Sequence, residues 1–312
     1  MPSQYARQRR DSREVWSVPK WPCRSWLIST VENEHFLEKG KHSDADALIL
    51  ELEAGTVDKE AARARVADAV RSVRDVDKYI VVRINPVDTE AGREDLRYAV
   101  RARPDAIMLT KVATADEVAL ADRMITELER ASDLPDGRIE LALMIERARA
   151  IFTAIDMPAA STRVKALCFG GGDYTADIHT RMSLGTGAPV MPGLEILVPR
   201  SLVVAAARAN DISPIDVPHL NVLDDKNFRV HAYESRALGF DGIIALHPRQ
   251  IPLTHEAFMP TLQEIADARD VVARYAAAVK EGKGVIGVRG EMISKTSAEW
   301  YQEVLDRAGV SA

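Results

Sequence analysis

The chain has 312 residues, of which 46% are hydrophobic and 28% are charged, and its formal net charge is −6 at pH 7. This composition is typical of a globular protein with a sizeable core, and the negative charge argues against nucleic acid as a partner. No apolar run is long enough to cross a membrane, and two cysteines are too few for a disulfide scaffold. We therefore expect a cytoplasmic protein that has no membrane partner.

Residues 1–20 are polar and lack the apolar core of a secretory signal, so we expect a flexible N-terminal tail there. After this tail, eight short apolar runs alternate with helical stretches such as Lys59–Val73 and Ala115–Ala131. Most of the runs are almost continuously apolar, which is typical of strands buried on both faces of a parallel sheet. The runs are Trp26–Ile28, Ala47–Leu50, Tyr79–Ile84, Ala106–Leu109, Leu141–Ile145, Val164–Phe169, Ser213–Val217 and Gly242–Leu246.

Eight alternating β and α units predict an α/β fold, a (β/α)8 TIM barrel over residues 21–260. An open, doubly wound sheet is the alternative fold. The absence of a GxGxxG motif after the first strand argues against this alternative.

Residues 261–312 are predicted to form a C-terminal helical extension, with helices over Glu264–Val279 and Thr296–Ala308. Between these helices the segment EGKGVIGVRGE contains four glycines, a spacing that predicts a hinge or loop and not a core element. We expect the extension to contact a neighbouring subunit.

The active site of a TIM barrel lies at the C-terminal ends of its strands, where the following loops supply the functional side chains. The positions that fall there are rich in charged residues, more so than a structural rim requires. They are Thr30, Glu51, Glu53, Arg83, Asn85, Lys111, Glu146, the Gly170–Asp173 turn, Asp216 and His247. We interpret His247, which precedes a proline, as a hydrogen-bonded structural residue.

Glu146 and Asp173 follow neighbouring strands of the predicted barrel, so their carboxylates should lie side by side. Two close carboxylates are unfavourable unless a cation separates them or one of them is protonated. Oxygen ligands suit Mg²⁺ or Mn²⁺ better than zinc. The alternative interpretation is that each carboxylate pairs with a nearby Arg or Lys.

Arg83 and the glycine run are candidates for holding a substrate carboxylate. The planar guanidinium of Arg83 can contact a carboxylate at two points, although a rim salt bridge with Glu51 or Glu53 is the alternative. The Gly170–Gly172 run lacks the ending of a nucleotide-binding P-loop, and we predict a tight turn whose N–H groups face an anion.

Seven segments together resemble a known family. They are RSWLIST, LILELEAGTV, VRINPVDT, IMLTKV, LMIERARAI, CFGGGDYTADI and GFDGIIALHPRQI, in this order along the chain. The set resembles the HpcH/HpaI aldolase and citrate lyase β-subunit superfamily, and within it the CitE-like CoA-ester lyases. The resemblance runs from about Arg24 to the C-terminus.

This resemblance implies a Mg²⁺-dependent carbon–carbon lyase on a TIM barrel, with Mn²⁺ as a substitute metal. It implies an oxo acid and a CoA thioester as partners, and a homotrimer or homohexamer. Glu146 and Asp173 correspond to the family's metal ligands. The expected substrate-binding residues are Arg24, Arg83, Lys111, Gly171, Gly172 and Asp173, and the expected catalytic residues are Arg83, Glu51 and Glu53.

Two positions depart from the family pattern. Family members have an acidic residue where this chain has Ala54, and the lyases have an Asp, which reaches a neighbouring subunit's site, where it has Ser294. Losing a positioned acid/base costs ~10²–10⁴-fold in rate. Three functions are therefore weighed: the CoA-ester lyase, an aldolase for free oxo acids without CoA, and a catalytically weak accessory subunit that binds metal and oxo acid.

Overall fold

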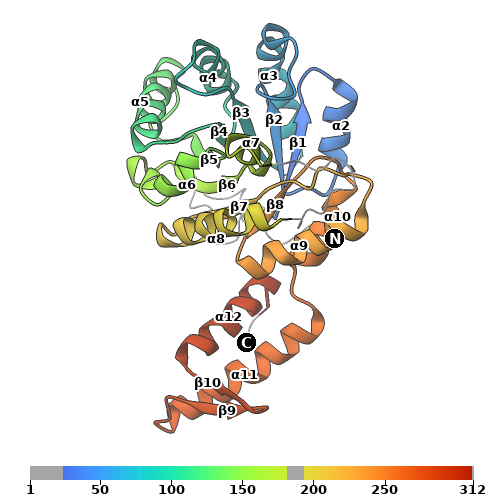
Figure 1. Cartoon of the computed structure of the whole chain (residues 1–312), viewed down its shortest axis with the longest axis vertical. Coiled ribbons are helices and arrows are strands. Elements are labelled where there is room, and N and C mark those ends of the chain that lie inside the picture. The colour runs from blue at the N-terminus through green and yellow to red at the C-terminus, as the bar shows by residue number, and fades with distance from the viewer. Residues whose placement is uncertain (1–23, 77, 181–192, 311–312) are drawn as a thin grey trace. The chain divides into compact units, whose positions relative to one another are not determined.

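The computed structural model describes residues 24–76, 78–180 and 193–310. Eight parallel strands close into a barrel in chain order, with β1 paired to β8, and the connecting helices lie around them (Figure 1). The strands are β1 (Ser25–Thr30), β2 (Ala47–Glu51), β3 (Tyr79–Ile84), β4 (Ala106–Leu109), β5 (Glu140–Ile145), β6 (Val164–Phe169), β7 (Ser213–Asp216) and β8 (Gly242–Ala245). The predicted TIM barrel is confirmed.

The helices begin where the sequence supplies capping residues. The side chains of Asn33, Asp58 and Thr114 accept hydrogen bonds from backbone N–H groups in the first turn of the helix that each precedes. The barrel helices are α2 (Glu34–His42), α3 (Lys59–Arg74), α4 (Glu90–Ala102), α5 (Ala115–Ala131), α6 (Ala148–Thr153), α7 (Gly171–Asp177), α8 (Leu194–Ala209), α9 (Asp225–Leu238) and α10 (Gln250–Phe258), with a 3₁₀ turn at Met157–Ala160.

The barrel interior is an apolar cluster formed by alternate residues of the strands. Its buried members include Ile49 of β2, Val81 of β3, Met144 of β5 and Cys168 of β6. Because strand side chains alternate with a period of two, the residue two positions after each of these points the same way. The side chains at the C-terminal rim therefore lie directly above the apolar interior.

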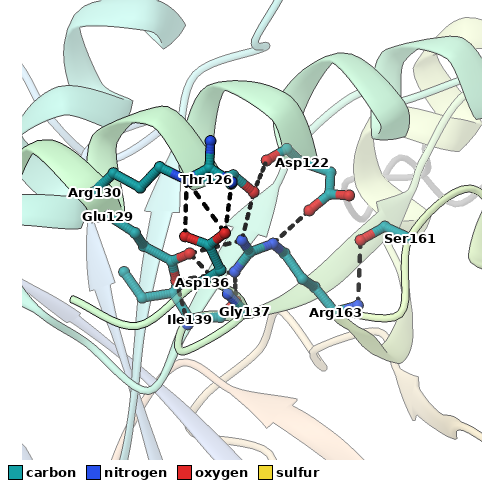
Figure 2. A network of polar contacts seen from close by, with 9 residues as sticks. All are labelled: Asp122, Thr126, Glu129, Arg130, Asp136, Gly137, Ile139, Ser161 and Arg163. Carbon is teal, nitrogen blue, oxygen red and sulfur yellow. Dashed lines mark hydrogen bonds and ion pairs between the residues drawn. The ribbon is translucent and has the colours of Figure 1, made fainter.

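An ionic network lies where α5 ends and β5 and β6 begin (Figure 2). The guanidinium of Arg163 donates to both carboxylate oxygens of Glu129, at 2.9 and 2.6 Å. The same carboxylate accepts the N–H groups of Gly137 and Ile139 at 2.9 and 2.8 Å. The charge of Arg163 thus neutralises a carboxylate that has no exposure to solvent, and four donors satisfy its hydrogen bonds.

The chain divides into two compact units, and the second starts at His255. Within it, α11 (Leu262–Lys280) packs against α12 (Lys295–Ala308), and α11 begins with a capping box formed by Thr261 and Glu264. Within the described residues, no helix is long and apolar enough to cross a membrane.

The glycine-spaced segment is not the loop that the sequence predicts. It forms an antiparallel hairpin of β9 (Ile286–Val288) and β10 (Glu291–Ile293), with Gly290 at a φ of 87° in the turn. Val288 and Ile293 are buried in a cluster with Val271. The prediction that this segment lies outside a core is wrong, because alternate apolar residues between the glycines face α11.

Candidate active site

The rim residues extend the alternating rows of the barrel interior. Glu51 ends β2, two residues after Ile49, and Arg83 stands two residues after Val81 in β3. The strand register pairs Glu51 directly with Arg83. Glu146 follows β5, two residues after Met144, so these three side chains form one polar layer above the apolar interior.

Glu146 is held closely on two sides. Its Oε1 accepts the backbone N–H of Lys111 at 2.8 Å. On the other side a Cβ atom at Gly170 would lie 2.5 Å from the Cβ and 2.6 Å from the Oε2 of Glu146, so only glycine fits there. Burial, together with the charge of Asp173, raises the pKa of Glu146 to about 8.

Arg83 is surrounded by carboxylates. Its Nη2 forms an ion pair with Oε2 of Glu51 and lies 3.7 Å from Oε2 of Glu53. The rim salt bridge that was the alternative interpretation of Arg83 is therefore present. Burial opposes the charge of Arg83, but the charges of Glu51, Glu53 and Glu146 raise its pKa, so it remains cationic.

The salt bridge leaves part of the Arg83 guanidinium unused. Its Nε is buried and has no hydrogen-bond partner among the residues that the structure describes. A buried donor without an acceptor is costly, so this position suits an acceptor from a bound molecule. A carboxylate of a bound molecule is an acceptor of the right kind.

Lys111 lies between two carboxylates of the rim, those of Glu53 and Asp173. Its ammonium donates to Oε1 of Glu53 at 3.0 Å and lies 3.5 Å from Oδ1 of Asp173. Burial opposes its charge, but Glu53, Asp173 and Glu146 raise its pKa. Of the two predicted metal ligands, Asp173 is therefore paired with a lysine, whereas no Lys or Arg side chain within the described ranges forms an ion pair with Glu146.

The glycine run begins a short helix. Gly170 is the N-cap of α7, and Gly171, Gly172 and Asp173 form its first turn instead of an isolated tight turn. The first N–H groups of a helix have no partner within that helix, so these groups remain available for an acceptor. The Asp173 side chain is 54% exposed.

Arg24 is not brought to this rim. It precedes β1 at the opposite end of the barrel, where its Nε and Nη2 donate to Asp46 at 2.9 Å. At roughly 3.3 Å per residue, the six residues of β1 separate this end from the rim by about 20 Å. We therefore correct the assignment of Arg24 as a substrate-binding residue: here it joins β1 to β2.

Two further rim positions have structural partners. Asp216 at the end of β7 is buried and accepts three hydrogen bonds from the guanidinium of Arg200 on α8. The backbone N–H groups of Leu246 and His247 donate to Oε1 of Gln250, whose amide donates to His219 O. Sequence reasoning missed Gln250 because its partners are backbone atoms of two loops, and a single polar residue in an apolar helix gives no sign of them.

The closed barrel and the carboxylates and cations at its C-terminal rim define a TIM-barrel enzyme. The model of the HpcH/HpaI aldolase/citrate lyase family matches residues 24–248. The chain belongs to this family.

Similar proteins of known name indicate the type of reaction. The chain is 31% identical to the citrate lyase subunit beta of Haemophilus influenzae, over 91% of this chain and 96% of that protein. It is 30% identical to an L-malyl-CoA/beta-methylmalyl-CoA lyase of Cereibacter sphaeroides, over 93% and 96% of the two chains. The crystal structure of CitE from Mycobacterium tuberculosis with magnesium, acetoacetate and coenzyme A matches with a TM-score of 0.72 at 26% identity, over 92% and 98% of the chains. The chain is a carbon–carbon lyase, as the resemblance predicts.

Proposed function

We propose that the chain cleaves a β-hydroxyacyl-CoA thioester into a 2-oxo acid and an acyl-CoA, with Mg²⁺ bound by Glu146 and Asp173. The observation that carries this proposal is the immobilised Glu146 carboxylate beside Asp173, next to the buried and unpartnered Nε of Arg83. The substrates named for the relatives support the CoA ester.

The donor set fits a hard divalent cation. Two carboxylates whose charges oppose each other, one of them buried, gain most from a cation between them. Two side-chain ligands with water completing the shell are typical of Mg²⁺, which keeps several waters, and Mn²⁺ accepts the same oxygens. Within the described residues no group of three or more acidic, His or Cys side chains is placed to hold a metal, which also argues against zinc.

The bond that breaks joins the hydroxyl-bearing carbon to the α-carbon of the thioester. The hydroxyl loses its proton and becomes the carbonyl of the oxo acid, while the electron pair forms an enolate that is then protonated. When bound, the metal supplies positive charge that polarises the oxygen of the oxo acid. Arg83 holds the carboxylate of the substrate, and the first N–H groups of α7 assist it.

Glu53 is the group we assign to the hydroxyl proton. It is a carboxylate of the β2–α3 loop whose side chain faces Arg83 and Lys111, and these two cations hold it above the rim. In the neighbouring position Ala54 has no group that transfers a proton. The proposal also includes a homotrimer or homohexamer, which the resemblance of the C-terminal extension supports.

The metal assignment is tested with Glu146→Gln and Asp173→Asn, each of which keeps the size of the side chain and removes its charge. We expect both variants to fold and to lose tight Mg²⁺ binding in isothermal titration calorimetry. The matched control is Glu94→Gln, a partly exposed residue of α4 whose one ion pair within the described residues is with Arg97. Unchanged Mg²⁺ affinity in both site variants would rule out these ligands.

The three candidate functions differ in their response to CoA esters. We expect Mg²⁺-dependent release of 2-oxo acid from malyl-CoA or citramalyl-CoA, measured as the phenylhydrazone. Cleavage of free hydroxy-oxo acids, with no effect of CoA, would favour the aldolase. Binding of Mg²⁺ and oxo acid with no cleavage of either substrate class would favour the accessory subunit.

A further inference from the structure

Lys111 has a backbone conformation that its side chain disfavours. It directly follows Thr110 at the end of β4, and its φ is 55°, in the left-handed region. Arg103 also has a positive φ, but it is the C-cap of α4, where a left-handed residue is common. Lys111 ends no helix, so the usual reason for this conformation does not apply.

The conformation directs one backbone donor at the candidate metal ligand. The Lys111 N–H donates to Oε1 of Glu146 at 2.8 Å. The preceding residue is fixed as well, because Thr110 Oγ1 donates to the Ile84 carbonyl of β3 at 2.7 Å. With Gly170 against the other oxygen, the Glu146 carboxylate is confined between two backbone segments.

The same residue supplies a cation between the other carboxylates. Its ammonium reaches Glu53 at 3.0 Å and Asp173 at 3.5 Å. A single residue therefore contacts Glu146 through its backbone and Asp173 through its side chain. Strain of this kind persists where the surrounding structure over-determines it, and it is concentrated at functional sites.

We infer that Lys111 is a positioning residue whose left-handed backbone orients Glu146 for the divalent cation, independently of its ammonium group. This inference rests on the proposed function, since it concerns the metal assigned there. Groups that hold a metal ligand from behind typically change metal affinity by about 10–100-fold when they are removed.

Three variants separate the backbone from the side chain. Lys111→Gly and Lys111→Met both remove the ammonium, and both residues adopt the left-handed conformation at no greater cost than lysine. Lys111→Val removes the ammonium too, but its β-branched side chain excludes this conformation. We expect Gly and Met to have similar Mg²⁺ affinities, and Val to lose about 10–100-fold more than Met in calorimetry. Equal affinities of Val and Met, or an equal loss in all three, would overturn the inference.

A second measurement needs no metal and so separates the inference from the proposed function. In ¹⁵N-lysine-labelled protein without Mg²⁺, the Lys111 amide should be protected from hydrogen exchange, and Glu146→Ala should remove this protection. The amide of Lys41, inside α2, serves as the control in both proteins. If the Lys111 amide is protected but the protein does not bind Mg²⁺ in calorimetry, only the proposed function is contradicted. If the Lys111 amide is unprotected in the wild type, the positioning role is contradicted.

Discussion

Arg83 has two separate donor nitrogens in one plane, which a lysine cannot reproduce. One nitrogen pairs with Glu51, while the Nε remains buried and unbonded within the part of the chain described. We expect Arg83→Lys to weaken binding of pyruvate or glyoxylate by more than tenfold, because lysine keeps the charge but loses the planar fork. Calorimetry in saturating Mg²⁺ measures this, with Arg130→Lys on the exposed end of α5 as the control. Unaltered affinity for every oxo acid tested would make Arg83 a structural residue.

Glu140 predicts a pH dependence at the opposite end of the barrel. Burial raises the pKa of this carboxyl, against the hydrogen bond that Tyr79 donates to it. A raised pKa in the folded state means that the folded protein binds the proton more tightly than the unfolded chain does. Its contribution to stability is therefore present below the unfolded pKa and is lost as the pH rises through the folded pKa.

The expected outcome is a shift in the stability of Glu140→Gln relative to the wild type. Glutamine cannot ionise and still accepts the Tyr79 hydroxyl, so the variant should gain on the wild type as the pH rises from the ordinary glutamate pKa of about 4.3 towards neutrality. Urea unfolding at several pH values measures the difference. A difference that is constant across this range would show that Glu140 does not titrate differently on folding.

The elements show how far sequence reasoning reaches. Continuous apolar runs predicted every strand of the barrel, and the ends of these runs gave Glu51, Arg83 and Glu146 as rim residues. The structure shows that they form one layer above the apolar interior. Arg24 was misplaced because a residue before a strand and a residue after it look alike in a motif, although they lie at opposite ends of the barrel. The β9–β10 hairpin was missed because the four glycines between residues 281 and 291 are typical of a loop.

The contacts within the site were less predictable than its residues. The hydrogen bond from the Lys111 backbone to Glu146 depends on the positive φ of Lys111. A positive φ can be predicted from sequence at a glycine, but not at a lysine. Likewise the free Nε of Arg83 depends on which nitrogen Glu51 occupies. Residue types and strand ends give the candidates, and side-chain geometry decides their partners.

The ion pair between Glu129 and Arg163, where α5 meets the start of β6, is expected to contribute strongly to the free energy of unfolding. Glu129→Gln replaces a carboxylate oxygen that accepts Arg163 and Gly137 with an amide that cannot accept from them. It leaves the buried Arg163 without its main counter-charge, and such a loss typically costs ~3–5 kcal/mol. Urea unfolding should show this loss, while Glu127→Gln on the exposed face of α5 changes little. Equal stability of the two variants would mean that Asp122 alone neutralises Arg163.

At the scale of the whole molecule, the barrel and the C-terminal unit each have their own buried core. The site residues described above all belong to the barrel. The second unit contributes Ser294, the position where the resembling lyases have an Asp that reaches a neighbouring subunit's site. Ser294 is the N-cap of α12, and both Asp and Asn are favoured at N-caps.

Ser294→Asp should therefore fold like the wild type and supply a second acid/base in addition to Glu53. We expect at least a tenfold gain in the cleavage of malyl-CoA or citramalyl-CoA, and a gain of this size corresponds to ~1.4 kcal/mol of transition-state stabilisation. Ser294→Asn is the matched control, because it keeps the cap and the size without a titratable group. We expect Ala54→Asp to add to the gain only in the double variant, because the resemblance to the lyases implies that both positions serve one site. Fast turnover by the wild type would show that Ser294 is no defect and that another residue, Glu53 or Glu291, already transfers the proton. Inactivity of every variant, with oxo acid still bound, would favour the accessory subunit.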